Sequence, residues 1–391
     1  MNARITLENG ESPAKVSIVV PIYHGKHYIP SLIAQAKANA QAVSCGLELL
    51  LVNDAPEDPI RPERGADNLR IHILQTDRNR GIHGARVRGL GYAEGEFVLF
   101  LDQDDRIAPD YIKRQLAVVK AADAVVCKAY QGEREFYSRN RTLGRGICKE
   151  SMMREGNQII SPGQVLIRKE AVPAFWKENL LHYNGADDWF LWLCMLCEEK
   201  RFVCNEEALF EHVLHAENTS KDSLSMHKSV CEVYEKLKKN KCCTEKEQEE
   251  IRTYVEKHGN TCIEERDKFL RLYSLLEDWM TIREQGRSVA DYLHRQGWSR
   301  VAIYGKGQVG KRLARELLER EIDVSCFIDR AADVLAGEIK AVLPEEFSQH
   351  SVPVVITLAG PEADRVSRGL KERGAKAVYM LSAIMEDLKH D

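Results

Sequence analysis

The chain has 391 residues, which exceeds the usual size of one domain and predicts two or three. Lysine and arginine total 56 against 60 acidic residues, so the formal net charge of -4 argues against the strongly basic domain of a dedicated nucleic-acid binder. With 44% hydrophobic and 30% charged residues, the composition is that of a globular protein and excludes a mostly disordered chain.

The sequence indicates a cytoplasmic protein. No run of residues approaches the roughly 18 consecutive apolar positions that a membrane-spanning helix needs. The start of the chain lacks the basic opening and the apolar core of a secretion signal. The 11 cysteines do not show the spacing of a disulfide framework. We therefore expect free thiols in a reducing cytoplasm.

Apolar runs alternate with helical patterns across residues 1–223, the first predicted domain. Helical periodicity covers residues 29–42 and 84–93. The apolar runs are nearly continuous, as expected of strands that are buried on both faces of a parallel sheet. They occupy residues 16–20, 48–52, 71–74 and 97–101. This alternation predicts an α/β domain.

Two further regions follow in the chain. Residues 224–297 place apolar side chains at helical spacing among many charges, and we interpret them as a helical linker. From residue 298 to residue 391 the α/β rhythm returns, which predicts a small Rossmann-like domain. Its expected strands occupy residues 301–304, 324–328, 352–358 and 377–381.

The most distinctive chemical feature is an acidic cluster, Asp102, Asp104 and Asp105, at the end of the apolar run 97–101. Carboxylates this close repel one another unless a cation neutralises them. Mg²⁺ and Mn²⁺ prefer oxygen ligands and are often shared between carboxylates and substrate phosphates. The carboxyl end of a parallel strand is also where ligands bind in open α/β folds. The cluster therefore predicts a divalent-cation site, with a solvated acidic turn as the alternative.

Four segments of the first domain resemble, in order and spacing, the motifs of family 2 glycosyltransferases with the GT-A fold. The segments are residues 19–23, 52–56, 78–86 and 93–105. The resemblance covers roughly the first 220 residues and implies a mixed sheet with flanking helices. It also implies an inverting transfer of a sugar from a nucleotide-diphosphate donor. His24 departs from the family pattern, in which asparagine is common, and this puts its local hydrogen bonding in doubt.

The resemblance implies roles for single residues on the donor side. Tyr23 would lie against the nucleobase, and Asp54 would accept a hydrogen bond from it. Arg86 would pair with the diphosphate or orient the acidic cluster. The other members of the implied nucleotide-sugar site are Pro21, Gly81, Asp102 and Gln103.

The resemblance also implies a set of metal ligands for Mn²⁺ or Mg²⁺. The set consists of Asp102, Asp104, Asp105 and His215. His212 competes with His215 for the last position, because both belong to the segment that resembles the closing histidine of the family. The cation would bridge the diphosphate and offset the charge that grows on it as the glycosidic bond breaks.

Inverting transfer needs a carboxylate that takes the proton of the acceptor hydroxyl. Asp187 and Asp188 precede the apolar helical segment 189–196. By resemblance, Asp188 falls on the position of the catalytic base and Asp187 on that of its acidic neighbour. The alternative is simple capping of the helix by these carboxylates. Residues 161–168 resemble the strand that forms the floor of the acceptor site.

A glycine-rich turn opens the second domain. Gly305, Gly307 and Gly310 follow a strand and precede a helix, which fits the dinucleotide-binding fingerprint. Asp329 ends the next strand, close to the expected place of an acid that binds ribose. Either NAD(P) or another nucleotide binds here, or the turn serves only tight packing.

The sequence as a whole predicts a metal-dependent glycosyltransferase that uses a nucleotide-diphosphate sugar. The family implies a glycan or lipid-linked acceptor in bacterial surface polysaccharide synthesis, which would bring the protein to the inner face of the cell membrane. Two alternatives remain: a nucleotide-sugar oxidoreductase that uses NAD(P), and a nonenzymatic assembly role for the second domain. The oligomeric state, the sugar and the acceptor are not predicted.

Overall fold

The computed structural model describes residues 4–7, 14–61, 68–132, 134–136, 143–213, 222–330, 339–348 and 351–390. The chain divides into two compact units, Met1–Cys262 and Ile263–Asp391. Residues 224–297, which the sequence marks as a linker, are therefore divided between the two units. Helix α9 (Glu245–Glu284) contains the boundary between them.

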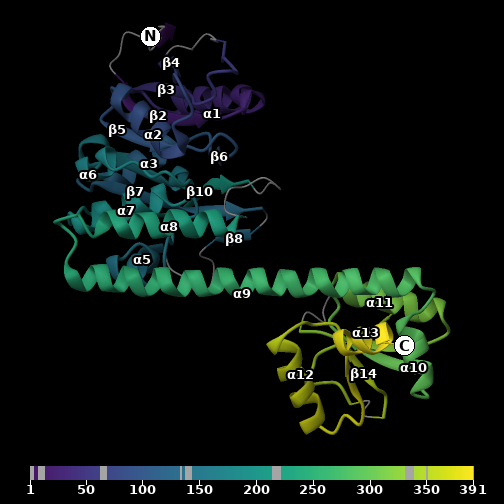
Figure 1. Cartoon of the computed structure of the whole chain (residues 1–391). Helices are drawn as coiled ribbons and strands as arrows, with labels where there is room; N and C mark the ends of the chain where they lie inside the picture. The colour runs from purple at the N-terminus through teal and green to yellow at the C-terminus, as the bar shows by residue number, and fades with distance from the viewer. Residues whose placement is uncertain are drawn as a thin grey trace. The chain divides into compact units, whose positions relative to one another are not determined.

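The described residues of the first unit form a ten-stranded mixed sheet (Figure 1). Its strand order is β1-β4-β3-β2-β5-β9-β7-β10-β6, with β8 paired to β7. The strands are β1 (Arg4–Leu7), β2 (Ala14–Ile22), β3 (Gly46–Asn53), β4 (Leu69–Gln75), β5 (Phe97–Phe100), β6 (Arg106–Ile107), β7 (Ala124–Gln131), β8 (Arg134–Phe136), β9 (Val165–Arg168) and β10 (Phe202–His212). The four apolar runs predicted as strands are β2 to β5, and these pair in parallel.

Strand β9, in the middle of the sheet, runs opposite to both of its neighbours. It pairs antiparallel with β5 on one side and with β7 on the other. Beyond it, β7 and β10 are parallel to each other. The predicted mixed sheet is thus confirmed, and the antiparallel insertion places the end of β10 on the same side as the end of β5.

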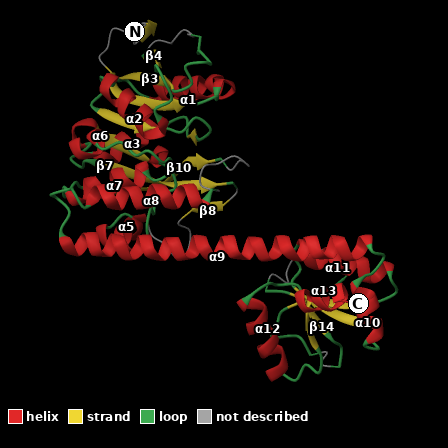
Figure 2. Cartoon of the chain, in the orientation of Figure 1, coloured by secondary structure: helices red, strands yellow, loops and turns green. Residues whose placement is uncertain are grey.

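Helices cover both faces of this sheet (Figure 2). On β2, Val19 belongs to the core beneath α7, whereas Ile18 and Val20 belong to the core beneath α1 and α3. This alternation follows from the two-residue period of a strand. The helices of the first unit are α1 (Ile29–Ala42), α2 (Gly81–Tyr92), α3 (Tyr111–Val119), α4 (Leu143–Gly146), α5 (Lys149–Arg154), α6 (Ala174–Glu178), α7 (Asp187–Cys197), α8 (Ser223–Leu237) and the first part of α9.

A buried polar group fixes the turn that leads into β5. Ser17 Oγ donates to Glu48 Oε1 at 2.5 Å, and the backbone N–H of Glu94 donates to the same oxygen at 2.5 Å. The N–H of Gly95 donates to Ser17 Oγ at 2.9 Å. A Cβ at Gly95 would lie 2.7 Å from that hydroxyl oxygen, so only glycine fits. These bonds set where β5 begins and hence where its acidic end lies.

The second unit contains a five-stranded sheet in the order β13-β12-β11-β14-β15. All its pairs are parallel, and this order is that of doubly wound dinucleotide-binding folds. The strands are β11 (Arg300–Tyr304), β12 (Asp323–Ile328), β13 (Ala341–Val342), β14 (Val354–Ile356) and β15 (Val378–Met380). The helices are the rest of α9, α10 (Val289–Arg295), α11 (Gln308–Glu319), α12 (Pro361–Glu372) and α13 (Leu381–His390).

Among the helices that the structure describes, none combines the length and the apolar composition needed to cross a membrane.

Candidate active site

The acidic cluster lies where the sequence places it, directly after β5, but its members differ in environment. Asp105 is buried, whereas Asp102 and Asp104 are only partly covered. The carboxylate of Asp105 accepts hydrogen bonds from Ser161 Oγ at 2.8 Å and from the backbone N–H of Val213 at 3.2 Å. Asp105 therefore ties the cluster to the end of β10 and to the turn before β9.

His212, at the end of β10, is the histidine that the structure places at the cluster. Its Nδ1 lies 2.9 Å from Asp105 Oδ1. The bond to Asp105 raises the pKa of His212, while burial and the neighbouring Asp102 raise the pKa of Asp105 to about 6. His215, the other histidine of the segment, lies outside the described residues.

Arg86 connects the acidic cluster to the start of α7. This guanidinium, on α2, is 3% exposed and donates to Asp102 through Nη2 and to Asp187 through Nη1. Burial opposes its charge, but Asp102 and Asp187 raise the pKa of Arg86 above its usual value. Its Nε is buried with no acceptor among the described residues. One planar cation thus holds together two carboxylates that are far apart in sequence.

Asp188 lies beside this pair, in the first turn of α7. Asn157 Nδ2 donates to Asp188 Oδ2 at 2.8 Å, and the N–H of Trp189 donates to Oδ1 at 2.7 Å. Burial and the charge of Asp187 raise the pKa of Asp188 to about 7. A carboxylate with a pKa near neutrality is a stronger base than a solvated one and is still largely ionised above pH 7. Asp187 is paired with the Arg86 guanidinium, and the N-cap position of α7 is Ala186.

Tyr23 and Gln103, both predicted from the sequence to bind the nucleotide sugar, are hydrogen-bonded to each other. The backbone N–H of Tyr23 donates to Gln103 Oε1 at 3.1 Å, and Gln103 Nε2 donates to Tyr23 O at 3.4 Å. A Cβ at Gly25 would lie 2.0 Å from Gln103 Oε1, so this contact requires glycine there. Tyr23 is 50% exposed, and its ring lies edge-on to that of His24, with ring centroids 4.3 Å apart. Pro21 is buried in β2.

Asp54 orients the loop that leads into α2. Its two carboxylate oxygens both accept from the backbone N–H of Arg80, each at 2.9 Å. Burial raises the pKa of Asp54 despite this hydrogen bond. Gly81, the next residue, has a φ of +72°, and a Cβ there would lie 2.9 Å from Asn184 Oδ1. In this structure the Asp54 carboxylate therefore binds the backbone that leads into α2.

Three residues at the site received no role from the sequence. Ser161 and Asn157 contact Asp105 and Asp188, and His83 packs against Trp176 with ring centroids 4.4 Å apart. Burial lowers the pKa of His83 to about 4, and its Nδ1 accepts from the N–H of Leu181 at 3.1 Å. Ser161 and His83 lie in segments that resemble family motifs, so the resemblance could have pointed to both residues. No sequence pattern pointed to Asn157.

The donor atoms of the acidic cluster suit a hard cation. Asp102 and Asp104 offer partly exposed carboxylates, whereas the Asp105 oxygens are engaged by Ser161, Val213 and His212. Two groups of His, Cys, Asp or Glu among the described residues have ligand atoms within 4.8 Å of one another, and neither includes these aspartates. A cation here would therefore need oxygens from a substrate as well, as is usual for Mg²⁺.

The glycine turn of the second unit is built as the sequence predicts. Gly305 has a φ of +99°, and a Cβ at Gly310 would lie 1.9 Å from Gly305 O. A Cβ at Gly307 would meet open space. Asp329 Oδ2 accepts from the N–H of Lys306 at 2.7 Å, so this carboxylate holds the turn. The packing requirement is therefore real at Gly305 and Gly310, and the ligand remains a prediction.

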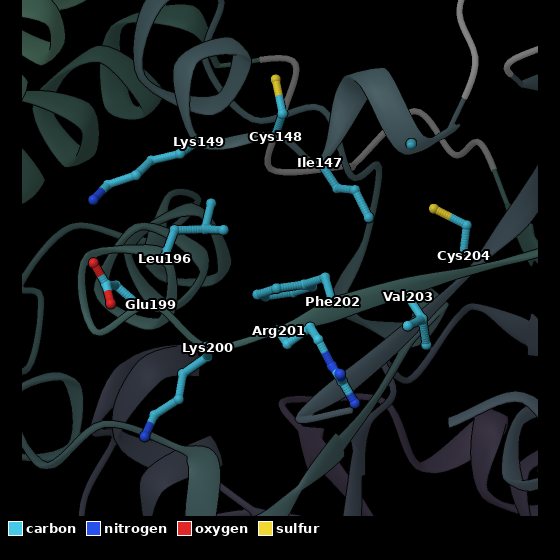
Figure 3. A pocket seen from close by; sticks show the side chains of 11 residues that line it. Ile147, Cys148, Lys149, Leu196, Glu199, Lys200, Arg201, Phe202, Val203 and Cys204 are labelled. Atoms are coloured by element: carbon cyan, nitrogen blue, oxygen red, sulfur yellow. The ribbon is translucent and has the colours of Figure 1, made fainter. Parts of the chain in front are cut away.

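A cavity of about 540 Å³ in the first unit lies away from these residues (Figure 3). Ile147, Leu196 and Phe202 are among the residues that line it, and Phe202 begins β10. His212, at the acidic cluster, ends the same strand. The eleven residues of β10 span roughly 35 Å, so the cavity and the cluster are at opposite ends of the strand. The cavity is not the candidate active site.

A comparison with curated proteins finds relatives of part of the chain. The undecaprenyl-phosphate 4-deoxy-4-formamido-L-arabinose transferase of Salmonella paratyphi A is 32% identical over 108 residues. The matched segment covers 26% of this chain and 33% of the relative. The chain thus matches about one third of the length of this relative.

Solved structures of two transferases are similar in part. The Staphylococcus aureus (S. aureus) protein TarS, residues 1–349 in complex with UDP-GlcNAc, is 18% identical, with a TM-score of 0.44 over 62% of this chain and 72% of that one. The Pyrobaculum calidifontis mannosyltransferase PcManGT, in complex with GDP-Man and Mn²⁺, is 15% identical, with a TM-score of 0.42 and the same coverage of 62% and 72%. Similarities at this level do not bear on the activity of this chain.

The family comparison concerns the part of the first unit that carries the acidic cluster and Arg86. The model described as "Glycosyl transferase family 2" matches residues 17–175. These residues include all four segments that resemble the family in sequence. The segment 17–175 therefore belongs to glycosyltransferase family 2.

Proposed function

We propose that the first unit transfers a sugar from a nucleotide-diphosphate sugar to a hydroxyl group of a glycan or lipid-linked acceptor. The observation that carries the proposal is the bridge from Asp102 through Arg86 to Asp187, which brings Asp188 beside the acidic cluster. Two carboxylate environments result: one partly exposed, at the end of β5, and one buried, at the start of α7. In a displacement at one carbon atom, the first would serve the leaving diphosphate and the second the attacking hydroxyl group.

On the donor side, the exposed ring of Tyr23 would stack on the nucleobase, and Gln103 would keep the Tyr23 backbone in place. Asp102 and Asp104 would hold Mn²⁺ or Mg²⁺ together with oxygens of the diphosphate. When bound, the cation offsets the negative charge on the departing nucleoside diphosphate. Arg86 would hold Asp102 in position for this role through their ion pair.

On the acceptor side, Asp188 would act as the general base. The acceptor oxygen forms a bond to the anomeric carbon while its proton passes to Asp188, and the bond from that carbon to the diphosphate oxygen breaks with its electron pair. A single displacement of this kind inverts the configuration of the carbon. Asp187 stays paired with Arg86, so its charge raises the pKa of Asp188 and makes it a better proton acceptor.

The experiment is a screen of nucleotide-diphosphate sugars with Mn²⁺ and Mg²⁺, in which release of nucleoside diphosphate is measured with candidate acceptors. We expect one donor to be turned over only when a divalent cation is present. Asp104→Ala and Asp188→Asn should each reduce turnover by at least 100-fold. Asp110→Ala is the matched control, because Asp110 is an aspartate of the same unit that pairs with Arg114. Full activity of the Asp188→Asn variant would refute its role as base.

The relative in Salmonella acts on undecaprenyl phosphate, as its name states. We infer a lipid-phosphate or glycan acceptor for this chain too, and a peripheral contact with the cytoplasmic membrane face would follow from it. A screen with short-chain polyprenyl phosphates and with oligosaccharides separates the two acceptor classes. Turnover with neither class would contradict the inference.

A further inference from the structure

Helices α8 and α9 each carry a histidine and a cysteine four residues apart. His227 and Cys231 belong to α8, and His258 and Cys262 belong to the part of α9 that lies in the first unit. Residues at positions i and i+4 lie on one face of a helix. Helices α8 and α9 run side by side (Figure 1). Between them, His227 contacts both His258 and Cys231, and His258 contacts Cys262.

The ligand atoms of three of these residues are close enough to surround one ion. His227 Nδ1 lies 3.1 Å from His258 Nδ1, and Cys262 Sγ lies 3.7 Å from His258 Nδ1. Each of the three offers one ligand atom within 4.8 Å of the others. Around a tetrahedral zinc ion, two nitrogens would be about 3.3 Å apart and a nitrogen and a sulfur about 3.6 Å apart, given bonds of about 2.05 and 2.3 Å. Both measured distances are close to these values.

We propose that His227 Nδ1, His258 Nδ1 and Cys262 Sγ bind a zinc-class divalent ion. Imidazole nitrogen and thiolate sulfur favour zinc over the hard cations that suit the acidic cluster. The thiol of Cys262 donates to the carbonyl oxygen of Ser223 at 3.4 Å, and it loses its proton to solvent when the ion binds. All three ligand residues are half-buried, and water would complete the coordination of the bound ion.

Cys231 acts as a positioning residue in this arrangement. Its Sγ lies 3.5 Å from Nε2 of His227, the ring nitrogen that does not face His258. A metal-bound histidine usually donates its second N–H to a partner, which fixes the ring.

Gly259 makes room for the site. Glycine inside a helix costs about 1 kcal/mol relative to alanine, so its presence calls for a reason. A Cβ at Gly259 would lie 2.9 Å from Cε1 of His227 and 3.0 Å from its Nε2. The glycine thus allows the imidazole of α8 to approach α9 closely.

A second group, Cys197, Cys243 and Glu247, also has ligand atoms within 4.8 Å of one another. There, however, Glu247 is paired with the ammonium group of Lys149, whose positive charge opposes a cation. An ion bound by His227, His258 and Cys262 would link α8 to α9 at Cys262, the last residue of the first unit.

The test uses the purified full chain, treated with a chelator under reducing conditions and then titrated with Co²⁺ and Zn²⁺. We expect one Co²⁺ per chain with a thiolate-to-cobalt charge-transfer band, and displacement of Co²⁺ by Zn²⁺. The band requires a sulfur ligand, so it distinguishes this site from cation binding at Asp102 and Asp104. Cys262→Ser should abolish the band, and His258→Ala should weaken binding at least 100-fold.

Cys231→Ser should retain the band and weaken binding about tenfold, as expected of a residue that acts through a ligand. Cys242→Ser, an exposed cysteine, and Cys197→Ser, from the second group, are the controls and should leave the titration unchanged. A wild-type chain without the band overturns the proposal, whether or not the variants fold. Persistence of the band in Cys262→Ser, or its loss in Cys197→Ser, also overturns it.

Discussion

Replacing Asn157 by alanine should raise the pKa of Asp188 and move the pH dependence of transfer to higher pH. The amide of Asn157 donates to Asp188 Oδ2 at 2.8 Å, and this hydrogen bond stabilises the ionised carboxylate. Without it, burial and the charge of Asp187 raise the pKa of Asp188 further. The base then needs a higher pH to lose its proton.

The expected shift follows from the strength of one hydrogen bond to a charged group. Such bonds contribute about 1.5–3 kcal/mol, and the exposed position of Asn157 favours the low end. About 1.5 kcal/mol corresponds to roughly one pKa unit. A shift of the Asp188 pKa from about 7 to roughly 8 lowers the ionised fraction about tenfold at pH 6 and hardly at all at pH 9.

The assay is kcat/KM against pH for the donor that the screen identifies, with carboxyl NMR titration as a direct reading of the pKa. Asn157→Asp should shift the profile further than Asn157→Ala, because it adds a negative charge. Asn179→Ala is the matched control, since Asn179 Nδ2 donates to the Phe175 carbonyl and not to Asp188. A loss of activity that is equal at every pH would refute Asp188 as the group that limits the rate at low pH.

Three further predictions concern stability. Arg86→Ala should destabilise the first unit by about 3–5 kcal/mol in urea unfolding, because it leaves the buried carboxylate of Asp187 and the partly covered one of Asp102 without their cation; Arg86→Lys should recover only part of this. The pKa of Asp188 is raised in the folded state, so its contribution to stability is present below pH 4 and is lost as the pH rises through about 7. Asp188→Asn should therefore gain stability relative to wild type between pH 4.5 and 7.5, by as much as about 4 kcal/mol, and a constant difference would contradict this. Gly310→Ala should lower the melting temperature of the second unit, because its Cβ would meet Gly305 O, whereas Gly307→Ala should not.

Much of the fold could be predicted because the central strands are nearly continuous apolar runs. All eight residues of β3 are buried, and such a run has few alternatives to a central strand. Strand β10 is different, since Glu206 and Glu207 interrupt its apolar pattern and it was not predicted. The antiparallel position of β9 also depends on pairing between distant segments, which local periodicity does not encode.

The candidate site was predictable where its residues follow a strand or begin a helix. Asp102 and Asp188 are of this kind, because an element end fixes their neighbourhood. The bridging role of Arg86 and the contact of Asn157 with Asp188 join segments that only folding brings together. The same is true of His227 and His258, which lie 31 positions apart in the chain.

The bridge formed by Arg86 has a consequence for divergence among relatives. A planar guanidinium has a fixed size, so it sets the separation of Asp102 and Asp187 independently of the loops between them. Insertions and deletions in those loops should therefore leave the spacing of the two carboxylates unchanged. Under the proposed function, such tolerance would let the acceptor change by loop exchange alone.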